Sequence, residues 1–289
     1  MPRPPRQLMT SGEFAALADR LGHPKPASPD VLGGVALVRE GVVVSVGDVP
    51  AAPGLPAGVL AVAGASTPFR LNQWTESSAD WVAVNDRIEI DVHGSTSMTH
   101  LDTTAHFSWE GRSVQTDADP LLTLAATGIV GRGILIDVPG VLGMDATGQV
   151  ITLADVQEVL ARTGAEPRRG DILHFSFGRT ERARSDRAIG SVPTAGLSIE
   201  CVEWLAGIGP SAVVTDEGLD SSPSEVEGQP VPWHLLLLTV LGIPLVDRAI
   251  LTRLARTCAA LGRWEFFSIL SPLPIPGASG APLNPLALF

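Results

Sequence analysis

The spacing of apolar and polar positions predicts two clear helices. One begins with Ser11 as its N-cap and ends near Gly22, and the other follows the N-cap Thr152 and ends at Gly164. In both, a hydroxyl at the start, apolar residues on one face and a final glycine match the pattern of an amphipathic helix. The first is expected to lie at the periphery, and a third helix is predicted over residues 198–206.

Buried strands are predicted where apolar runs stand between turn residues. These runs are residues 129–138, 172–177, 212–216 and 264–270. Continuous apolar runs of this length, bounded by Gly, Pro or charged residues, are typical of strands buried on both faces. With 289 residues, of which 45% are apolar, the chain can bury a large core as one big domain or two small ones.

The N-terminal part has a less regular pattern. Two β-branched runs within residues 35–46 predict a hairpin, and residues 50–58 are predicted to form a loop. Strict alternation in residues 88–92 predicts a half-buried strand that delivers His93 to the segment after it.

The later part of the chain presents carboxylates at the ends of predicted strands. Asp216 and Glu217 follow one such strand, and strand ends in open sheets commonly carry functional groups. Residues 221–232 are predicted to form a long polar loop able to cover a site. Residues 235–241 are predicted to form a helix, followed by a strand that delivers Asp247 to the site; the alternative for Asp247 is a surface ion pair with a neighbouring arginine.

Composition and charge argue against several classes of protein. The formal net charge of −11 disfavours a nucleic-acid surface, because neutralising phosphates requires clustered Lys and Arg. Cys201 and Cys258 are the only cysteines and are widely spaced, so core packing is expected of them, not a disulfide framework or a thiolate zinc site. The longest apolar run, residues 235–246, is too short to span a membrane. Without a signal-peptide pattern either, a soluble cytoplasmic protein is expected.

Candidate chemistry is concentrated in residues 93–107, HGSTSMTHLDTTAHF. Three of the six histidines and an aspartate lie within fourteen residues there. On an extended strand His100 and Asp102 point to one face, so together they could hold zinc, manganese or iron. His106 lies far enough beyond them to return over the same point as a ligand or a general base.

Two further histidines have apolar surroundings. His234 begins a fully apolar segment and needs a carboxylate, a backbone partner or a metal. His174 lies inside a predicted strand and is expected to be packed or hydrogen-bonded. Residues 179–187 alternate in charge and are predicted to form a solvated loop, with a contact to a substrate carboxylate as the alternative.

Four blocks of sequence carry a resemblance to a known family. They are THLDTTAHFSWEG, GDILHFSFGRT, LSIECVEWLA and WEFFSILSPLPIPGASGAPLNPLAL, and together they cover roughly residues 84–289. In this order they resemble the cyclase family that includes kynurenine formamidase and isatin hydrolase. Residues 84–289 are therefore expected to form the cyclase-like catalytic domain, with residues 1–83 as an N-terminal extension and hairpin packed on it in one compact unit.

The resemblance implies a mixed α/β fold, with a β-barrel-like sheet and flanking helices of the swivelling β/β/α type. It also implies a homodimer or homotetramer that hydrolyses the amide or lactam of a small-molecule substrate with one or two divalent metals, zinc or manganese. By position, His100 and Asp102 resemble the first ligands and His106 the acid/base. His234 and Asp247 resemble the later ligand pair.

Three features depart from the family pattern. Thr96 stands where formamidase-type members have a histidine, with His93 nearby, and Asp247 stands where glutamate is usual. Asp102 is followed by Thr103-Thr104-Ala105 instead of the usual D-A or D-x-P. Three functions therefore remain open: a hydrolase of a cyclic or formyl amide, a cyclase, dehydratase or lyase that uses the same pocket, and a non-catalytic binding protein.

Overall fold

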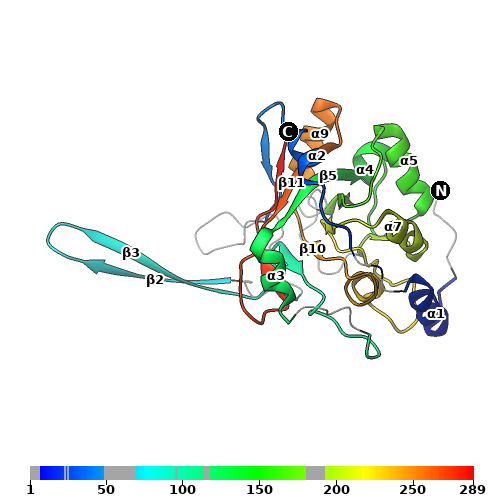
Figure 1. Ribbon diagram of the computed structural model, residues 1–289, viewed down its shortest axis with the longest axis horizontal. Helices are drawn as coiled ribbons and strands as arrows, with labels where there is room; N and C mark the ends of the chain where they lie inside the picture. The colour runs from blue at the N-terminus through cyan, green and yellow to red at the C-terminus, as the bar shows by residue number, and fades with distance from the viewer. Residues whose placement is uncertain are drawn as a thin grey trace.

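The fold is a curled, mixed nine-stranded sheet with flanking helices (Figure 1). It is seen in a computed structural model, which describes residues 7–22, 24, 26–48, 69–94, 97–112, 118–179 and 193–289. The predicted loop at residues 50–58 lies outside the described residues. The mixed α/β fold with a barrel-like sheet is confirmed.

The strands of the large sheet come from the whole length of the chain. In spatial order they are β1 (Val43–Ser45), β13 (Leu286–Leu288), β11 (Glu265–Leu270), β5 (Ile129–Asp137), β7 (Ile172–Ser176), β9 (Ala212–Thr215), β10 (Leu245–Asp247), β4 (His100–Asp102) and β12 (Gly280–Pro282). The central strands β5, β7, β9 and β10 run parallel to one another, and the outer strands pair antiparallel. All four predicted buried strands are confirmed within one or two residues.

Helices connect these strands. They are α1 (Ser11–Leu21), α2 (Val31–Val35), α3 (Pro120–Thr127), α4 (Val138–Leu142), α5 (Leu153–Thr163), α7 (Val202–Ile208, preceded by the 3₁₀ turn Ile199–Cys201), α8 (Pro232–Leu235), which continues as a π-helix over Leu236–Leu241, and α9 (Thr252–Leu261). Two short strands, β6 (Val150–Ile151) and β8 (Gly196–Leu197), pair separately. None of the helices in these described ranges is long and apolar enough to cross a bilayer.

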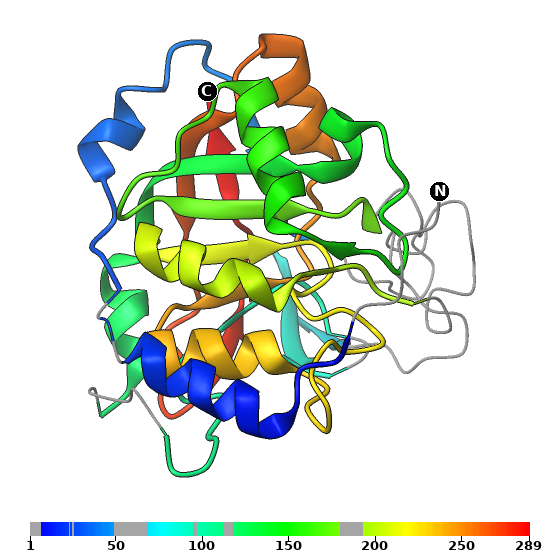
Figure 2. The same cartoon turned by 90° about the vertical axis from the view of Figure 1, so that its right-hand side faces the viewer.

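The core has two layers, one on each face of the sheet. Helices α1, α5, α7 and α8 lie across the outer face (Figure 2), where Ile134 and Phe175 are fully buried. The curled inner face closes around Leu135, Val214 and residues of α9. Successive residues of the central strands therefore point into different apolar layers, which explains why their sequences are continuous apolar runs. Both cysteines are buried in the core, as predicted.

Local capping signals account for the two clear helices. The Thr152 hydroxyl of α5 accepts the backbone N–H of Asp155, whose carboxylate accepts the Thr152 N–H in return, and Gly164 ends the helix in a left-handed conformation. Helix α1 is confirmed, but its N-cap is Thr10, not Ser11, because Thr10 forms the same reciprocal pair with Glu13.

The predicted hairpin within residues 35–46 is wrong. Asp30 caps Gly33 and starts the helix α2, which ends at Val35 and is followed by a turn where the first strand was expected. The second run does contain a strand, β1. The N–H groups of Glu40 and Gly41 both donate to the carbonyl of Phe289, which directs the next residues onto β13 at the end of the chain. The proline-rich C-terminal segment thus contains two strands, β12 and β13, that its composition did not predict.

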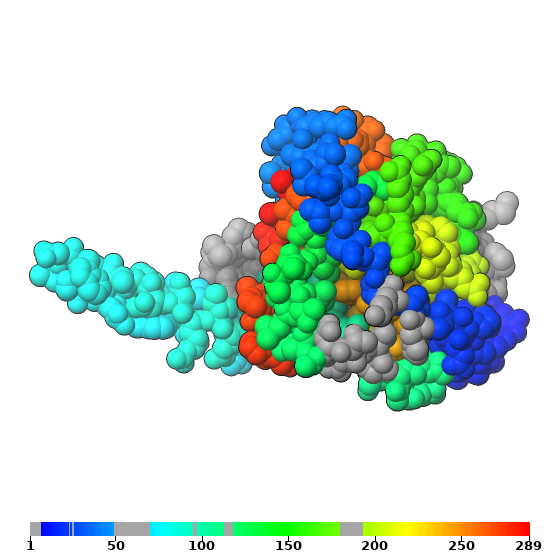
Figure 3. All heavy atoms as spheres, viewed as in Figure 1, coloured from blue at the N-terminus to red at the C-terminus, as the bar shows by residue number. Residues whose placement is uncertain are grey.

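A long two-stranded arm extends from the body (Figures 1 and 3). It consists of β2 (Phe69–Ser77) and β3 (Val82–Ile90), paired antiparallel. Residues 88–90 of the strand predicted at residues 88–92 belong to it, but the predicted burial is wrong, because Ile88 is 56% exposed. The alternating pattern correctly predicted an extended strand. Its prediction of a buried face was wrong, because no second layer covers the arm in the described part of the chain.

Candidate metal centre

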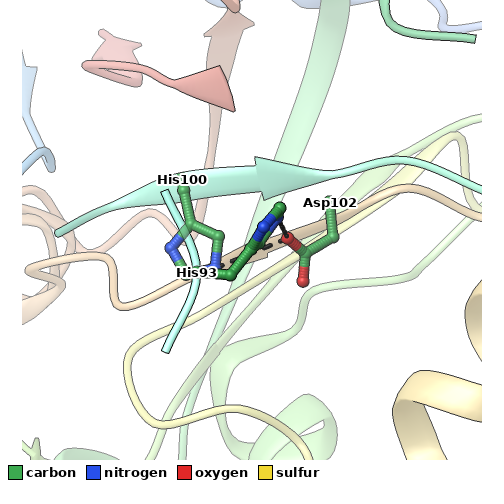
Figure 4. Close-up of side chains that lie close together, drawn as sticks. All are labelled: His93, His100 and Asp102. Atoms are coloured by element: carbon green, nitrogen blue, oxygen red, sulfur yellow. Dashed lines mark ion pairs between the residues drawn. The ribbon is translucent and has the colours of Figure 1, made fainter. Parts of the chain in front are cut away.

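Strand β4 places two polar side chains on one side of the sheet. His100 and Asp102 are separated by one residue and point the same way, as Figure 4 shows, while Leu101 points into the inner core. Asp102 is only 1% exposed and His100 is also buried. Hydrogen bonding to β10 and β12 on either side holds β4 in this position.

His93 completes a compact group with these two residues. Its Nε2 lies 3.0 Å from Oδ1 of Asp102, and Nε2 of His100 lies 3.4 Å from the same oxygen. One possible ligand atom from each side chain falls within 4.8 Å of the others. His100 is oriented by a 2.7 Å hydrogen bond between its Nδ1 and the Met98 carbonyl, which leaves Nε2 to face the group.

The three side chains fit a divalent cation. His93 Nε2 and Asp102 Oδ1 are buried and lack a hydrogen-bond partner, although they lie close together. Buried polar atoms without partners are unfavourable, and a cation bound by both would satisfy them. Two imidazole nitrogens and a carboxylate oxygen are a typical donor set for zinc and related ions.

Gly280 on β12 makes room for this arrangement. A Cβ at this position would lie 2.6 Å from Nε2 of His93 and 2.4 Å from the Leu101 carbonyl oxygen. Sequence reasoning missed Gly280, although a glycine inside a strand is a recognised signal of close approach.

His106 returns to the cluster through a short turn. Its backbone N–H donates to the Thr103 carbonyl at 3.0 Å, and its ring stacks on His93 with centroids 3.8 Å apart. Burial lowers the pKa of His106 to about 4, although the charge of Asp102 acts in the opposite direction. The ring is therefore neutral at pH 7.

His234 reaches the cluster from α8. Its Nδ1 is hydrogen-bonded to the carboxylate of Asp220, and its Nε2 points towards Asp247 Oδ2 at 3.5 Å and Asp102 Oδ2 at 3.8 Å. Burial alone would lower the pKa of His234, but Asp220 and Asp247 outweigh it and raise the pKa well above its ordinary value. The predicted approach of His234 to the first segment is thus present in the fold.

Asp220 is a site residue that sequence reasoning missed. Besides orienting His234, it accepts the Trp233 N–H at 2.6 Å, so it holds the beginning of α8 through two contacts. The available signal was its place directly before the polar loop that leads to His234. A carboxylate on the far nitrogen of a metal-facing histidine is a common way to fix the ring.

Asp247 lies opposite His100 in the pairing of β10 with β4. Burial alone would raise its pKa, but the interaction with His234 lowers the pKa to about 2. Its Oδ1 has no hydrogen-bond partner. Among the described residues, neither Arg248 nor Arg253 forms the surface ion pair considered as the alternative.

The remaining candidates lie elsewhere. Asp216 accepts three backbone N–H bonds from Phe177, Gly178 and Arg179 at 2.9, 3.0 and 3.1 Å, and Glu217 accepts one from Ala195 at 3.4 Å. These two carboxylates organise the loops beside the cluster. Thr96 lies outside the described residues.

His174 is buried in the core, as predicted. Its Nδ1 is 3.2 Å from the Ile172 carbonyl, and its ring packs edge-on against Phe266. Of the predicted solvated loop at residues 179–187, only Arg179 lies within the described residues, and it is buried instead of solvated.

Comparisons with known proteins agree with this architecture. The model of a family described as "Putative cyclase" matches residues 64–219. A crystal structure described as a novel cyclase has a TM-score of 0.75 at 24% identity, covering 90% of each chain. Isatin hydrolase A from Ralstonia solanacearum has a TM-score of 0.61 at 22% identity, covering 85% of this chain and 91% of that one.

A more distant structure has the same fold. A predicted metal-dependent hydrolase from Bacillus stearothermophilus has a TM-score of 0.51 at 18% identity, covering 86% of this chain and 98% of that one. A comparison with curated protein sequences finds no match. The structural likenesses establish the arrangement of the chain, and the chemistry must be argued from the site.

Proposed function

The chain belongs to the cyclase family, whose model it matches over residues 64–219, and from this premise we propose that it is a metal-dependent hydrolase. The reaction is the opening of a cyclic or formyl amide by water. The observation that carries the proposal is the group of His93, His100 and Asp102, with buried donor atoms that lack hydrogen-bond partners.

The residues of the site have two proposed roles: three of them bind the metal, and Asp220 orients His234. His93, His100 and Asp102 would hold a zinc or manganese ion. His234 approaches the other oxygen of Asp102, Oδ2, and lies beside Asp247. Such an ion supplies a Lewis acid that polarises a carbonyl and lowers the pKa of water towards neutrality. Asp220 keeps His234 turned towards the cluster.

His106 is the proposed acid/base. Its ring is neutral at pH 7, so an unprotonated nitrogen is available to take a proton from the attacking water. It then passes this proton to the leaving nitrogen, so a C–O bond forms as the C–N bond breaks. Stacking on His93 and contact with Phe107 hold the ring beside the cluster and limit its exposure to solvent.

Metal analysis combined with turnover in oxygen-18 water tests this function. Protein purified without chelator should contain about one divalent ion per chain or more. It should open members of a panel of formyl amides and lactams, with one oxygen-18 atom in the product. Turnover without oxygen-18 uptake would indicate a cyclase or lyase instead of a hydrolase. Ligand binding without turnover would indicate a non-catalytic binding protein.

The arm supports a proposal about assembly. Its exposed apolar side chains include Leu71, Trp74, Val84 and Ile88. Contiguous exposed apolar residues are unfavourable in water and commonly mark interfaces. A homodimer or homotetramer in which a second copy covers the arm would bury them. A monomer at micromolar concentration in light scattering would contradict this proposal.

A further inference from the structure

The turn that follows His106 is anchored to the N-terminal helix. Trp109 and Arg112 close this turn through two backbone hydrogen bonds, of 2.7 and 3.4 Å. The Trp109 ring is only 8% exposed and packs against the fully buried ring of Phe14 on α1, with centroids 5.0 Å apart. Arg112 covers the Trp109 ring, 4.7 Å from its centroid, and forms a 2.9 Å ion pair with Asp19, also on α1.

The ring contact is the stronger of these two anchors. Packing two aromatic rings against each other removes a large apolar area from water in a preferred geometry. The carboxylate of Asp19 is 70% exposed, and an ion pair so exposed contributes little to stability. Trp109 and Phe14 are thus the residues expected to hold the turn.

The other end of α1 holds the chain that leads to His234. The N–H of Met9 donates to the Glu225 carbonyl at 2.9 Å, and the Met9 carbonyl accepts the N–H of Glu227 at 2.9 Å. Ser11 donates its hydroxyl to the Glu227 carbonyl at 2.8 Å. Helix α1 also lies alongside the π-helix that continues α8 (Figure 2). One helix therefore contacts both of the segments that carry site histidines.

Phe107 lies between these two segments. Its ring centroid is 4.5 Å from that of His106 and 5.6 Å from that of His234. The backbone is fixed before it by the bond from the His106 N–H to the Thr103 carbonyl, and after it by the turn that Trp109 closes. A shift of Trp109 would therefore move Phe107 and His106 together. Because proton transfer needs heavy atoms about 3 Å apart, a displacement of about 1 Å is enough to slow a reaction about 10²-fold.

We propose that Trp109 is a positioning residue, which holds His106 in place by packing on Phe14 of α1. This inference rests on the proposed role of His106 as acid/base and extends that role to the N-terminal helix, because α1 then sets where His106 stands relative to His234. Strand β4 is held by strands on both of its sides, so the proposed metal ligands on it should stay in place when the turn moves.

Hydrogen exchange tests the anchor without requiring turnover. In the full-length protein as purified, the backbone amides of residues 103–112 should exchange about 10- to 100-fold faster in Trp109→Ala and in Phe14→Ala than in wild type, because the turn opens locally. The amides of β7 are the internal reference, and any acceleration there should be smaller. Trp264→Ala, a change at a half-buried tryptophan beside β11, should leave the exchange of residues 103–112 as in wild type.

Two results of this experiment would overturn the proposal. One is unchanged exchange of residues 103–112 in both alanine variants. The other is equal acceleration of these residues and of β7, which would mean that the substitutions loosen the whole fold instead of the turn.

Kinetics show whether the anchor positions His106. With an amide that wild type hydrolyses, Trp109→Ala should lower kcat about 10²-fold, while KM and metal content stay close to those of wild type. Trp109→Phe should restore most of kcat, because a smaller aromatic ring can still pack on Phe14. The double variant Trp109→Ala/Phe14→Ala should lose about as much as Trp109→Ala alone, because both changes remove one contact. Faster exchange with unchanged kcat would make the anchor merely structural and overturn the proposal.

The outcomes keep this proposal apart from the hydrolase proposal. If no amide is hydrolysed, crystal structures of wild type and Trp109→Ala decide the positioning role. Rings of His93 and His106 that remain stacked at 3.8 Å in the variant would overturn it, and separated rings would support it. If Trp109→Ala does not fold, Phe14→Leu, the milder change, should alter exchange and kcat in the same directions.

Discussion

The two halves of the site are built in different ways. The first half, His93, His100, Asp102 and His106, comes from one short segment around β4 and contains buried donor atoms without hydrogen-bond partners. The second half, Asp220, His234 and Asp247, comes from three separate elements whose side chains already bind one another. In the second half, Asp247 Oδ1 also lacks a hydrogen-bond partner, but Asp220 and Asp247 supply counter-charges to His234. A cation would therefore satisfy more of the unpaired donor atoms in the first half than in the second.

The pKa values of His106 and His234 shift in opposite directions, although burial acts to lower both. Burial lowers the pKa of His106 to about 4, while the pKa of His234 is raised because two carboxylates face its ring. Burial alone thus does not set the charge of a histidine; the nearby carboxylates do.

Asp102→Asn should abolish metal binding and turnover. Its carboxylate lies within reach of His93, His100 and His234, so its loss removes the charge common to both halves. Metal content should fall below about a tenth of an equivalent, and turnover should be lost with it. Asp19→Asn, at an exposed carboxylate, is the control. Retention of metal in Asp102→Asn and its loss in Asp247→Asn would reverse the roles of the halves.

His106→Ala should separate metal binding from proton transfer. The fold and most of the metal should remain, because His106 is outside the compact ligand group, while kcat should fall about 10²- to 10⁴-fold. Metal content and steady-state rates measured on the same preparation check this. Unchanged turnover with lost metal would make His106 a ligand.

His174 provides a reference for burial without a facing carboxylate. Its pKa is lowered by burial to about 4 from an unfolded value of 6.5. The neutral ring therefore contributes stability above pH 6.5 that is lost as the pH falls towards 4, by about 3 kcal/mol. Urea unfolding of His174→Gln should show a flatter pH dependence than wild type over this range. If the free energy of unfolding depends on pH equally in both proteins, groups other than His174 dominate acid unfolding.

Asp220→Asn should have the smallest effect. The amide can still meet Nδ1 of His234, but it no longer supplies the charge that raises the pKa of the ring. Metal affinity or activity should fall about 10- to 100-fold, the usual range for an orienting carboxylate. Metal titration followed by activity assays would measure it, and Glu227→Gln, at a surface carboxylate, should change neither. A loss as large as that of Asp102→Asn would place Asp220 among the ligands.

Local signals were sufficient where neighbouring residues decide the structure. The helix from Thr152 to Gly164 was predicted with both ends, because its capping groups lie within a few residues of the helix they cap. The hairpin predicted within residues 35–46 failed because the true partner of Val43 is Leu288, at the far end of the chain. No pattern near residue 43 contains that information.

The sequence alone predicts that His100 and Asp102 share one face of a strand, because the alternation of side chains along a strand requires it. Tertiary structure decided the rest: Gly280 leaves space for His93, Asp220 turns His234, and the pairing of β10 with β4 sets Asp247 opposite His100. These relations join segments far apart in sequence, and only the order and register of strands in the sheet bring them together.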